Sequence, residues 1–268
     1  MIDLDDVSTF PDCIREWVTD KRDFFLRVIP VGSYNFDYEI IHKLQNLRID
    51  EMSDFKGIYS LYQDTDFTGW HITRVENIDN YCKQGILTLG GEIDKGIERL
   101  NYYFNKVIKI EKIIYDKIVD EAKFLWNRDN GRKNNVCFFF TKAQTINDVQ
   151  AMMFAANLGG EILNWSLDAV NSDLYRTEPY KRLWILGTPC RVKFKAKLKE
   201  MYEDTGCRLI REIMFYYVMK DIYGFDYIPS DTGEKQGDVL PANILKIEHI
   251  ENYEKIMCQY PEFDDFYN

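Results

Sequence analysis

Apolar side chains recur at helical spacing near the start of the chain. Residues three or four apart lie on one face of a helix, so the pattern predicts amphipathic helices over residues 11–29 and 37–49 with a turn between them. The apolar positions are Ile14, Trp17, Val18 and Phe25 in the first stretch and Ile40, Ile41, Leu44 and Leu47 in the second. We interpret residues 1–55 as an N-terminal helical extension of a main domain that spans residues 56–268.

After residue 56, short apolar runs alternate with longer amphipathic stretches. The short aromatic and β-branched runs predict strands at residues 57–63, 69–73, 136–141 and 187–198, with a further short strand within 235–250. The amphipathic stretches predict helices at residues 94–126, 145–157 and 208–223. This mixture of strands and helices indicates an α+β fold.

The segment after the second short strand carries signals for a helix with defined ends. Thr73 and Glu76 have the spacing of a capping box, in which the two side chains bind the first backbone N–H groups of a helix. Ile78 and Tyr81 continue an apolar face, and Gly85 stands where the end of a helix favours glycine. The sequence therefore predicts a strand that ends at Thr73 and a helix directly after it.

One predicted strand alternates apolar and basic residues, which places five cations on one face: Arg191, Lys193, Lys195, Lys197 and Lys199. Two interpretations stay open, a contact for nucleic acid and a solvated sheet face or edge strand protected by lysines. The chain has 44 acidic and 34 basic residues and a formal charge of −10, so it has no global attraction for a polyanion. Any binding of nucleic acid would depend on this local patch.

Composition favours a folded protein, because 46% of residues are hydrophobic and 15% are aromatic. The six cysteines are scattered, without the spacing of a zinc site or a disulfide framework, so we expect reduced thiols in the core and no metal. No segment approaches the roughly 18 consecutive apolar residues of a membrane span, and the start of the chain is acidic, unlike a signal peptide. We therefore expect a cytoplasmic protein with no membrane partner.

Three polar groups would converge if the predicted strands pair. They are His71 near the end of one strand, Thr141 at the end of another, and a carboxylate from either Glu161 or Asp238. Each also has a purely structural interpretation: a satisfied histidine, a residue at the entry of a helix, or an ordinary Gly-Gly-Glu turn.

Taken together, these motifs resemble the ADP-ribosyltransferase superfamily, including its toxin-like branch. The matching features are an aromatic-His-x-Thr strand end, a helix of the form I-x-x-Y-x-x-x-G-I, the run FFFT and a late acidic residue, scattered over residues 57–250. The resemblance implies a split mixed β-sheet core flanked by helices. It also implies an NAD-dependent mono-ADP-ribosyltransferase that transfers ADP-ribose to a macromolecular acceptor, with nucleic acid as one candidate, and a toxin-neutralising partner protein.

The resemblance also implies roles for individual residues. His71 would bond the ribose on the nicotinamide side, and Asp238 matches the position of the family's glutamate but is one methylene shorter, which leaves Glu161 as the alternative carboxylate. The implied catalytic residues are thus His71, Glu161 and Asp238, and the implied NAD contacts are Trp70, His71, Thr73, Arg74, Phe140 and Thr141.

The chemistry of NAD explains the need for these residue types. Cleavage of its N-glycosidic bond passes through an oxocarbenium-like centre, which a nearby carboxylate stabilises. A histidine fixes the ribose hydroxyls, and an aromatic surface stacks on the nicotinamide ring. The chain has neither a G-x-G-x-x-G motif after a strand nor a P-loop motif, so the fingerprints of dinucleotide-binding dehydrogenases and of P-loop enzymes are both missing.

Three other functions remain open at this point. An NAD glycohydrolase would use water as the acceptor. A relative of RNA 2′-phosphotransferases would need arginines that converge on a phosphate, for which only Arg74 and Arg191 are candidates. A non-catalytic interaction module would use the 18 tyrosines for contacts and keep His71 as a structural residue. If the basic strand is a contact for nucleic acid, RNA or DNA would bind through Arg191, Lys193, Lys195 and Lys197.

Overall fold

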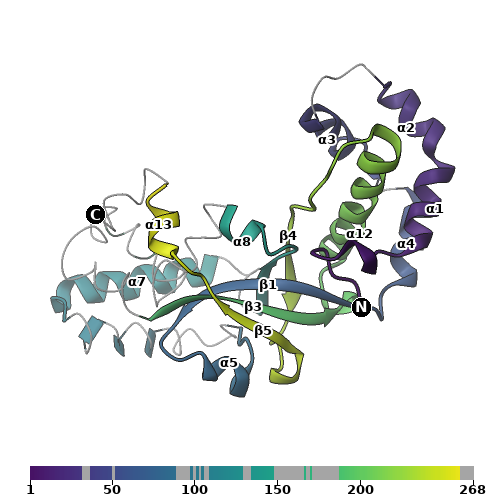
Figure 1. The fold of residues 1–268 in the computed structure, drawn as a ribbon. Helices are drawn as coiled ribbons and strands as arrows, with labels where there is room; N and C mark the ends of the chain where they lie inside the picture. The colour runs from purple at the N-terminus through teal and green to yellow at the C-terminus, as the bar shows by residue number, and fades with distance from the viewer. Residues whose placement is uncertain are drawn as a thin grey trace. The chain divides into compact units, whose positions relative to one another are not determined.

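A five-stranded antiparallel sheet joins the strands found in the described part of the chain (Figure 1). The computed structural model describes residues 1–31, 37–49, 52–88, 97–98, 101–102, 104–105, 109–128, 134–147, 166, 170 and 187–259. The strands are β1 (Asp66–Val75), β2 (Asn135–Phe139), β3 (Thr188–Lys197), β4 (Thr232–Gln236) and β5 (Ile244–His249). Their order across the sheet is β4-β2-β1-β3-β5. Helices flank the sheet, so the predicted α+β class is confirmed.

β3, the strand with the basic residues, lies between β1 and β5. Its antiparallel register with β5 pairs Cys190 with His249 and Arg191 with Glu248, and the register shifts between Lys193 and Phe194. Burial alternates along β3, because the apolar residues are buried and the basic ones are partly exposed. The predicted alternation is therefore confirmed from Arg191 to Lys197, whereas Lys199 lies beyond the strand in the 3-10 helix η5 (Leu198–Glu200). The interpretation of this segment as an edge strand is wrong.

The chain divides into two compact units. Unit 1 consists of Met1–Gly69, Phe138–Lys142 and Lys195–Lys235, and unit 2 consists of Trp70–Cys137, Ala143–Phe194 and Gln236–Asn268. Every strand except β5 has residues in both units. The division into an extension (1–55) and a main domain (56–268) stays a prediction.

Unit 1 is mostly helical. Its helices are η1 (Val7–Thr9), α1 (Asp12–Asp20), α2 (Arg22–Val28), α3 (Asp37–Gln45), α4 (Ser53–Leu61), η5 (Leu198–Glu200), α12 (Glu203–Tyr217) and the π-helix η6 (Val218–Tyr223). α1 and α4 both pack against α12, and most of the residues of α12 are buried. α12 is therefore the core helix of this unit, as its mostly apolar sequence after residue 208 predicts.

Unit 2 holds α5 (Asp79–Gln84), α7 (Lys112–Arg128), α8 (Gln144–Asn147), η7 (Pro241–Asn243) and α13 (Tyr253–Met257). α5 ends at Gly85, which has a φ of 76°, and the next residue, Ile86, forms an isolated antiparallel bridge with Val239. A Cβ atom on Gly85 would lie 1.9 Å from the Val239 carbonyl oxygen. Glycine is thus required here both for the backbone conformation and for the close approach of two chain segments.

The strand predicted for residues 57–63 is wrong, because this segment belongs to α4 and the turn after it. Phe55, Ile58 and Tyr59 are buried, with exposures of 1%, 9% and 7%. This spacing of three and one fits one face of a helix, whereas consecutive residues of a strand point to opposite faces. The short aromatic run concealed the helical period because Phe55 lies outside it.

The predicted capping box is also wrong. β1 continues through Thr73 to Val75, and α5 begins only at Asp79. The Oδ1 atom of Asn77 accepts a hydrogen bond from the backbone N–H of Asp79 at 2.9 Å. An asparagine therefore supports the start of this helix, although the spacing of Thr73 and Glu76 satisfied the sequence rule.

Other predicted helices are present with different limits. The N-terminal stretch divides at Lys21, which joins α1 to α2. Within the predicted stretch 94–126, Lys109 has a φ of 52° and α7 starts at Lys112. α8 covers the start of the predicted helix 145–157, and the remainder of that helix lies outside the described residues. In the part of the chain that the structure describes, no helix is both long and apolar enough to cross a membrane.

Candidate functional site

His71 lies on β1, next to β2. Its Nδ1 atom is 3.0 Å from the backbone oxygen of Cys137. Since a carbonyl oxygen only accepts hydrogen bonds, Nδ1 carries the proton and Nε2 of the neutral ring is left as an acceptor. Among the described residues, no hydrogen bond reaches Nε2. The ring thus has one anchored nitrogen and one with capacity for a further bond.

The surroundings of His71 favour the neutral ring. Burial lowers the pKa of His71, and this influence is larger than that of the carbonyl of Cys137, which raises the pKa. A residue whose ordinary pKa is 6.5 is therefore mainly neutral at pH 7, so Nε2 accepts a proton or a hydrogen bond rather than donating one.

Thr73 follows on the same face of β1, because alternate residues of a strand share a face. Its Oγ1 atom accepts a hydrogen bond of 3.1 Å from the hydroxyl of Tyr81 on α5. This contact ties α5 to β1 beside His71. The sequence pattern places Tyr81 on the apolar face of a helix and does not predict a role for its hydroxyl. The one signal for such a role is a tyrosine, with its polar end, on an otherwise apolar face.

Trp70 and Arg74 lie on the opposite face of β1. The ring of Trp70 is 3% exposed, and its centroid is 5.8 Å from Cζ of Arg191 and 5.2 Å from Nζ of Lys193. β1 therefore brings together His71 and Thr73 but separates them from Trp70 and Arg74.

Arg74 is enclosed by protein groups on that opposite face. Its side chain is 1% exposed, and Nη2 lies 3.9 Å from the carboxylate of Glu254. Nη1 donates to the carbonyl of Gly187 at 3.3 Å, and Cζ lies 5.2 Å from the ring centroid of Tyr253 on α13. These contacts give Arg74 a role in packing α13 against β1.

Asp238 follows β4 and holds a loop. Its Oδ1 atom accepts bonds from the backbone N–H of Thr88 at 2.7 Å and from the Thr88 hydroxyl at 2.8 Å. Next to it, Ile86 and Val239 exchange two backbone hydrogen bonds of 2.9 Å. The carboxylate of Asp238 is exposed, and the described residues make no bond to its other oxygen, Oδ2.

Phe140 and Thr141 belong to unit 1, whereas His71, Thr73 and Asp238 belong to unit 2. Phe140 is completely buried, and its backbone N–H donates to the carbonyl of Asp231 at 3.1 Å. Thr141 is 2% exposed and donates its hydroxyl to the carbonyl of Pro229 at 3.2 Å. Both side chains have structural partners within their own unit. Glu161, the other predicted carboxylate, lies outside the described residues.

The basic side chains of β3 and η5 have partners within the protein. Arg191 pairs with Glu248 at 2.9 Å, and Lys195 pairs with Asp66 at 3.6 Å. The backbone carbonyl of Asp64 accepts a hydrogen bond from Lys197 at 3.3 Å. The carboxylate of Asp64 pairs with Lys199 at 2.5 Å. A polyanion that binds this face would have to compete with these acidic groups.

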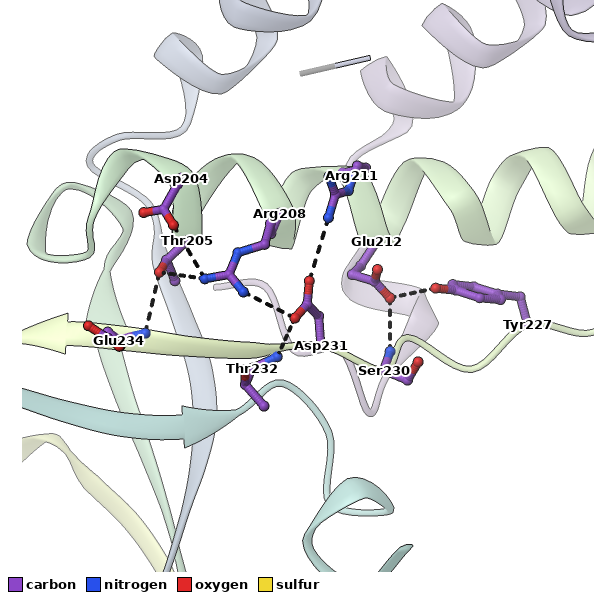
Figure 2. A network of polar contacts seen from close by, with 10 residues as sticks. All are labelled: Asp204, Thr205, Arg208, Arg211, Glu212, Tyr227, Ser230, Asp231, Thr232 and Glu234. Atoms are coloured by element: carbon purple, nitrogen blue, oxygen red, sulfur yellow. Dashed lines mark hydrogen bonds and ion pairs between the residues drawn. The ribbon is translucent and has the colours of Figure 1, made fainter. Parts of the chain in front are cut away.

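A polar network in unit 1 has no counterpart among the predicted site residues (Figure 2). It joins α12 to residues 225–231, the non-helical segment before β4, which we call the strap. Glu212 on α12 is 3% exposed; its Oε2 atom accepts from the Tyr227 hydroxyl at 2.6 Å and from the Ser230 N–H at 2.8 Å. Burial raises the pKa of Glu212 and also that of Tyr227.

The second half of this network surrounds Asp231 at the end of the strap. Arg208 approaches one carboxylate oxygen at 3.2 Å, and Arg211 approaches the other at 3.6 Å. The N–H of Thr232 donates to the same carboxylate at 2.7 Å. Two guanidinium groups from successive turns of α12 therefore hold one carboxylate, which fixes the strap along the helix.

No cluster for a metal is present in the described part of the chain, where no three His, Cys, Asp or Glu side chains gather at ligand distance. All six cysteines are free thiols. Only Cys190 and Cys207 are buried and Cys82 is exposed, so the expectation of core thiols is right for two of the six. Burial raises the pKa of Cys190 to about 12, which keeps that thiol protonated and unreactive.

Comparison with models of protein families, with curated proteins and with solved structures found no significant match. The functional inference therefore depends on the residues of this chain alone.

Proposed function

We propose that the protein is an NAD-dependent mono-ADP-ribosyltransferase of a toxin-like type, with its NAD site on the face of β1 that carries His71. The observation that supports this proposal most is the state of that ring. It is neutral, anchored through Nδ1 and unbonded at Nε2 among the described residues. Because the ring is also partly exposed, this acceptor nitrogen can receive a hydrogen bond from a ligand.

In this proposal Nε2 of His71 accepts a hydrogen bond from a ribose hydroxyl of NAD. Thr73, which shares the face, lies beside the nicotinamide side of the ribose, and Tyr81 orients the Thr73 hydroxyl. Trp70 and Arg74 are left out of the site, because they lie on the other face and are enclosed by Lys193, Arg191, Tyr253 and Gly187. Of the four residues of β1 that the resemblance implies, the proposal thus keeps His71 and Thr73 as NAD contacts.

The reaction needs a carboxylate, and two residues remain candidates for it. When the N-glycosidic bond breaks, nicotinamide leaves with the bonding electrons, and the acceptor forms a new bond to the anomeric carbon and loses a proton. A carboxylate stabilises the positive charge that develops on the ribose and takes up the proton. Asp238 has Oδ2 for this role while Oδ1 holds Thr88. Glu161 keeps the longer side chain that the resemblance implies.

The fold proposed with this function is an ADP-ribosyltransferase-like core. The order of β1, α5 and the Ile86–Val239 bridge agrees with the strand, helix and glycine of the family motif, and supports the proposal without deciding it. The acceptor that we propose is a macromolecule, with protein, DNA and RNA as the classes to be tested. An RNA 2′-phosphotransferase gains no support, because Arg74 and Arg191 both have protein partners.

The test is incubation of the purified protein with labelled NAD and separate pools of protein, DNA and RNA. We expect label transfer to one pool by the wild type, loss of transfer in His71→Ala, and loss in one of Asp238→Ala and Glu161→Ala. His42→Ala is the matched control, because His42 is an exposed histidine on α3 whose hydrogen bonds, within the described residues, reach only Asn46.

Each outcome separates the candidate functions. Release of nicotinamide without transfer to any pool would change the proposal to an NAD glycohydrolase. Neither transfer nor release, together with no thermal stabilisation by NAD, would contradict NAD chemistry and leave the non-catalytic interaction module.

A further inference from the structure

Glu212 is a buried ionisable group that the proposed NAD chemistry does not use. It lies in the middle of α12, and both of its hydrogen bonds come from the strap. Figure 2 shows that the two donors, Tyr227 and Ser230, reach the same oxygen of the carboxyl group. The strap is therefore attached to α12 at two points, through the carboxyl group of Glu212 and through the ion pairs of Asp231 with Arg208 and Arg211.

These bonds leave one carboxyl oxygen of Glu212 available for a proton. Both donors reach Oε2, and no hydrogen bond from the described residues reaches Oε1. A protonated carboxyl group accepts through its carbonyl oxygen and keeps its proton on the other oxygen. Oε1 can thus hold a proton without the loss of either bond.

The charged groups near Glu212 do not offset the cost of burying its negative charge. Burial has the largest influence and raises the pKa of Glu212. The hydrogen bonds from Tyr227 and Ser230 lower this pKa, Asp231 of the strap raises it, and Arg211 of α12 lowers it. The other elements packed on α12 direct their charged and titratable groups elsewhere. Asp12 and Arg15 of α1 act on Tyr217, and Tyr59 of α4 lies near Cys207 and Glu203. On η6, Lys220 contacts Tyr216 and Asp221 pairs with Arg15; on η5, Lys199 pairs with Asp64 and Glu200 accepts from the N–H of Lys197.

We propose that Glu212 is a proton-binding site and that the strap is a pH-sensitive latch, closed on α12 while Glu212 is protonated and released when it ionises. Ionisation places a charge in a buried site, and detachment of the strap lets water reach that charge. The inference is independent of the proposed NAD chemistry, because every residue in it belongs to unit 1.

The sign of the effect follows from the raised pKa of Glu212. The closed state binds the proton more tightly than the open state, so closing is most favourable below the ordinary carboxyl pKa of 4.5. The free energy of closing becomes less favourable as the pH rises from 4.5 to the raised pKa of Glu212 in the closed state. Above that raised pKa, the free energy of closing no longer changes with pH. Within this window the protection of the latch falls by up to about tenfold per pH unit.

The measurement is hydrogen exchange of the Ser230 amide from pH 5 to 8, corrected for the intrinsic exchange rate at each pH. We expect the protection to fall with pH in the wild type and to stay constant in Glu212→Gln, whose amide oxygen still accepts both bonds. Asp226→Asn, which removes an exposed carboxylate from the same strap, should follow the wild type. Equal slopes for the wild type and Glu212→Gln, or no slope in either, would overturn the proposal.

A second readout measures the proton directly. At pH 6, where ordinary carboxyl groups are ionised, the infrared spectrum of the wild type should contain the carbonyl band of a protonated carboxyl group. The band should be absent from the spectrum of Glu212→Gln and present in that of Asp226→Asn. Its absence from the wild type would contradict proton binding by Glu212.

Discussion

His71 in unit 2 and Glu212 in unit 1 are two titratable groups whose neutral forms are favoured by burial. They differ in how their hydrogen bonds are distributed. His71 makes one bond to a backbone carbonyl and retains Nε2 as an acceptor, whereas Glu212 receives two bonds from side-chain and backbone donors of the strap. The difference indicates that the first group can serve a ligand and the second holds the fold together.

A growth test in bacteria distinguishes the proposed roles of His71 and Glu212 most clearly. If His71 serves a toxic NAD-consuming reaction, expression of the wild type should arrest growth and His71→Ala should restore it. Glu212→Gln should leave the arrest unchanged, because its carboxyl group belongs to the strap. Equal growth of the wild type and His71→Ala would count against a toxic activity.

A second test concerns the loop that carries Asp238. Gly85→Ala forces an alanine into a left-handed conformation, which costs about 1–3 kcal/mol, and adds a Cβ atom that collides with the carbonyl of Val239. We expect a large loss of stability in a denaturant titration. Gly57→Ala is the matched control, because Gly57 is in α4 with nothing within 4 Å of the added atom, and it should stabilise the protein by about 0.5–1 kcal/mol. Similar losses in both variants would contradict the described geometry at Gly85.

The two groups should also give pH dependences of opposite sign. The lowered pKa of His71 means that stability present above pH 6.5 is lost as the pH falls from 6.5 to the lowered pKa. The raised pKa of Glu212 means that stability present below pH 4.5 is lost as the pH rises from there. Thermal melts should therefore show a weaker acid loss in His71→Asn and a weaker loss towards neutral pH in Glu212→Gln. Unchanged profiles in both variants would show that neither group titrates as its burial indicates.

The smallest expected effect concerns the contact between Tyr81 and Thr73. Tyr81→Phe removes one partly buried hydrogen bond, which typically contributes about 0.5–1.5 kcal/mol. We expect a loss of stability in this range and weaker NAD binding. Tyr38→Phe, on an exposed tyrosine of α3, should leave NAD binding unchanged. A Tyr81→Phe variant with wild-type stability and binding would remove Tyr81 from the site.

Local periodicity predicted most of the elements but not the contacts that form the sites. The alternation along β3 and the apolar run of β2 were readable because each repeats within a few residues. The same alternation could have separated Trp70 from His71, but the resemblance grouped these neighbours by sequence motif. Residues 57–63 were misread because their aromatic run is also compatible with a strand.

The network around Glu212 was not predictable because its partners are distant in sequence. Glu212 is 15 residues from Tyr227 and 18 from Ser230, and a glutamate in a helix is ordinarily exposed. Glu212 is buried where the strap lies along α12. Long-range packing of this kind leaves no local signal in a single sequence.

The most direct test of the central claim is calorimetric titration of NAD into the wild type and His71→Ala at pH 7, with His42→Ala as control. The account predicts binding to the wild type and to His42→Ala, and affinity weakened at least about tenfold in His71→Ala, the value of one lost hydrogen bond of about 1.4 kcal/mol. Equal affinity in all three proteins, or no binding to any, would contradict the assignment of the free His71 nitrogen to NAD.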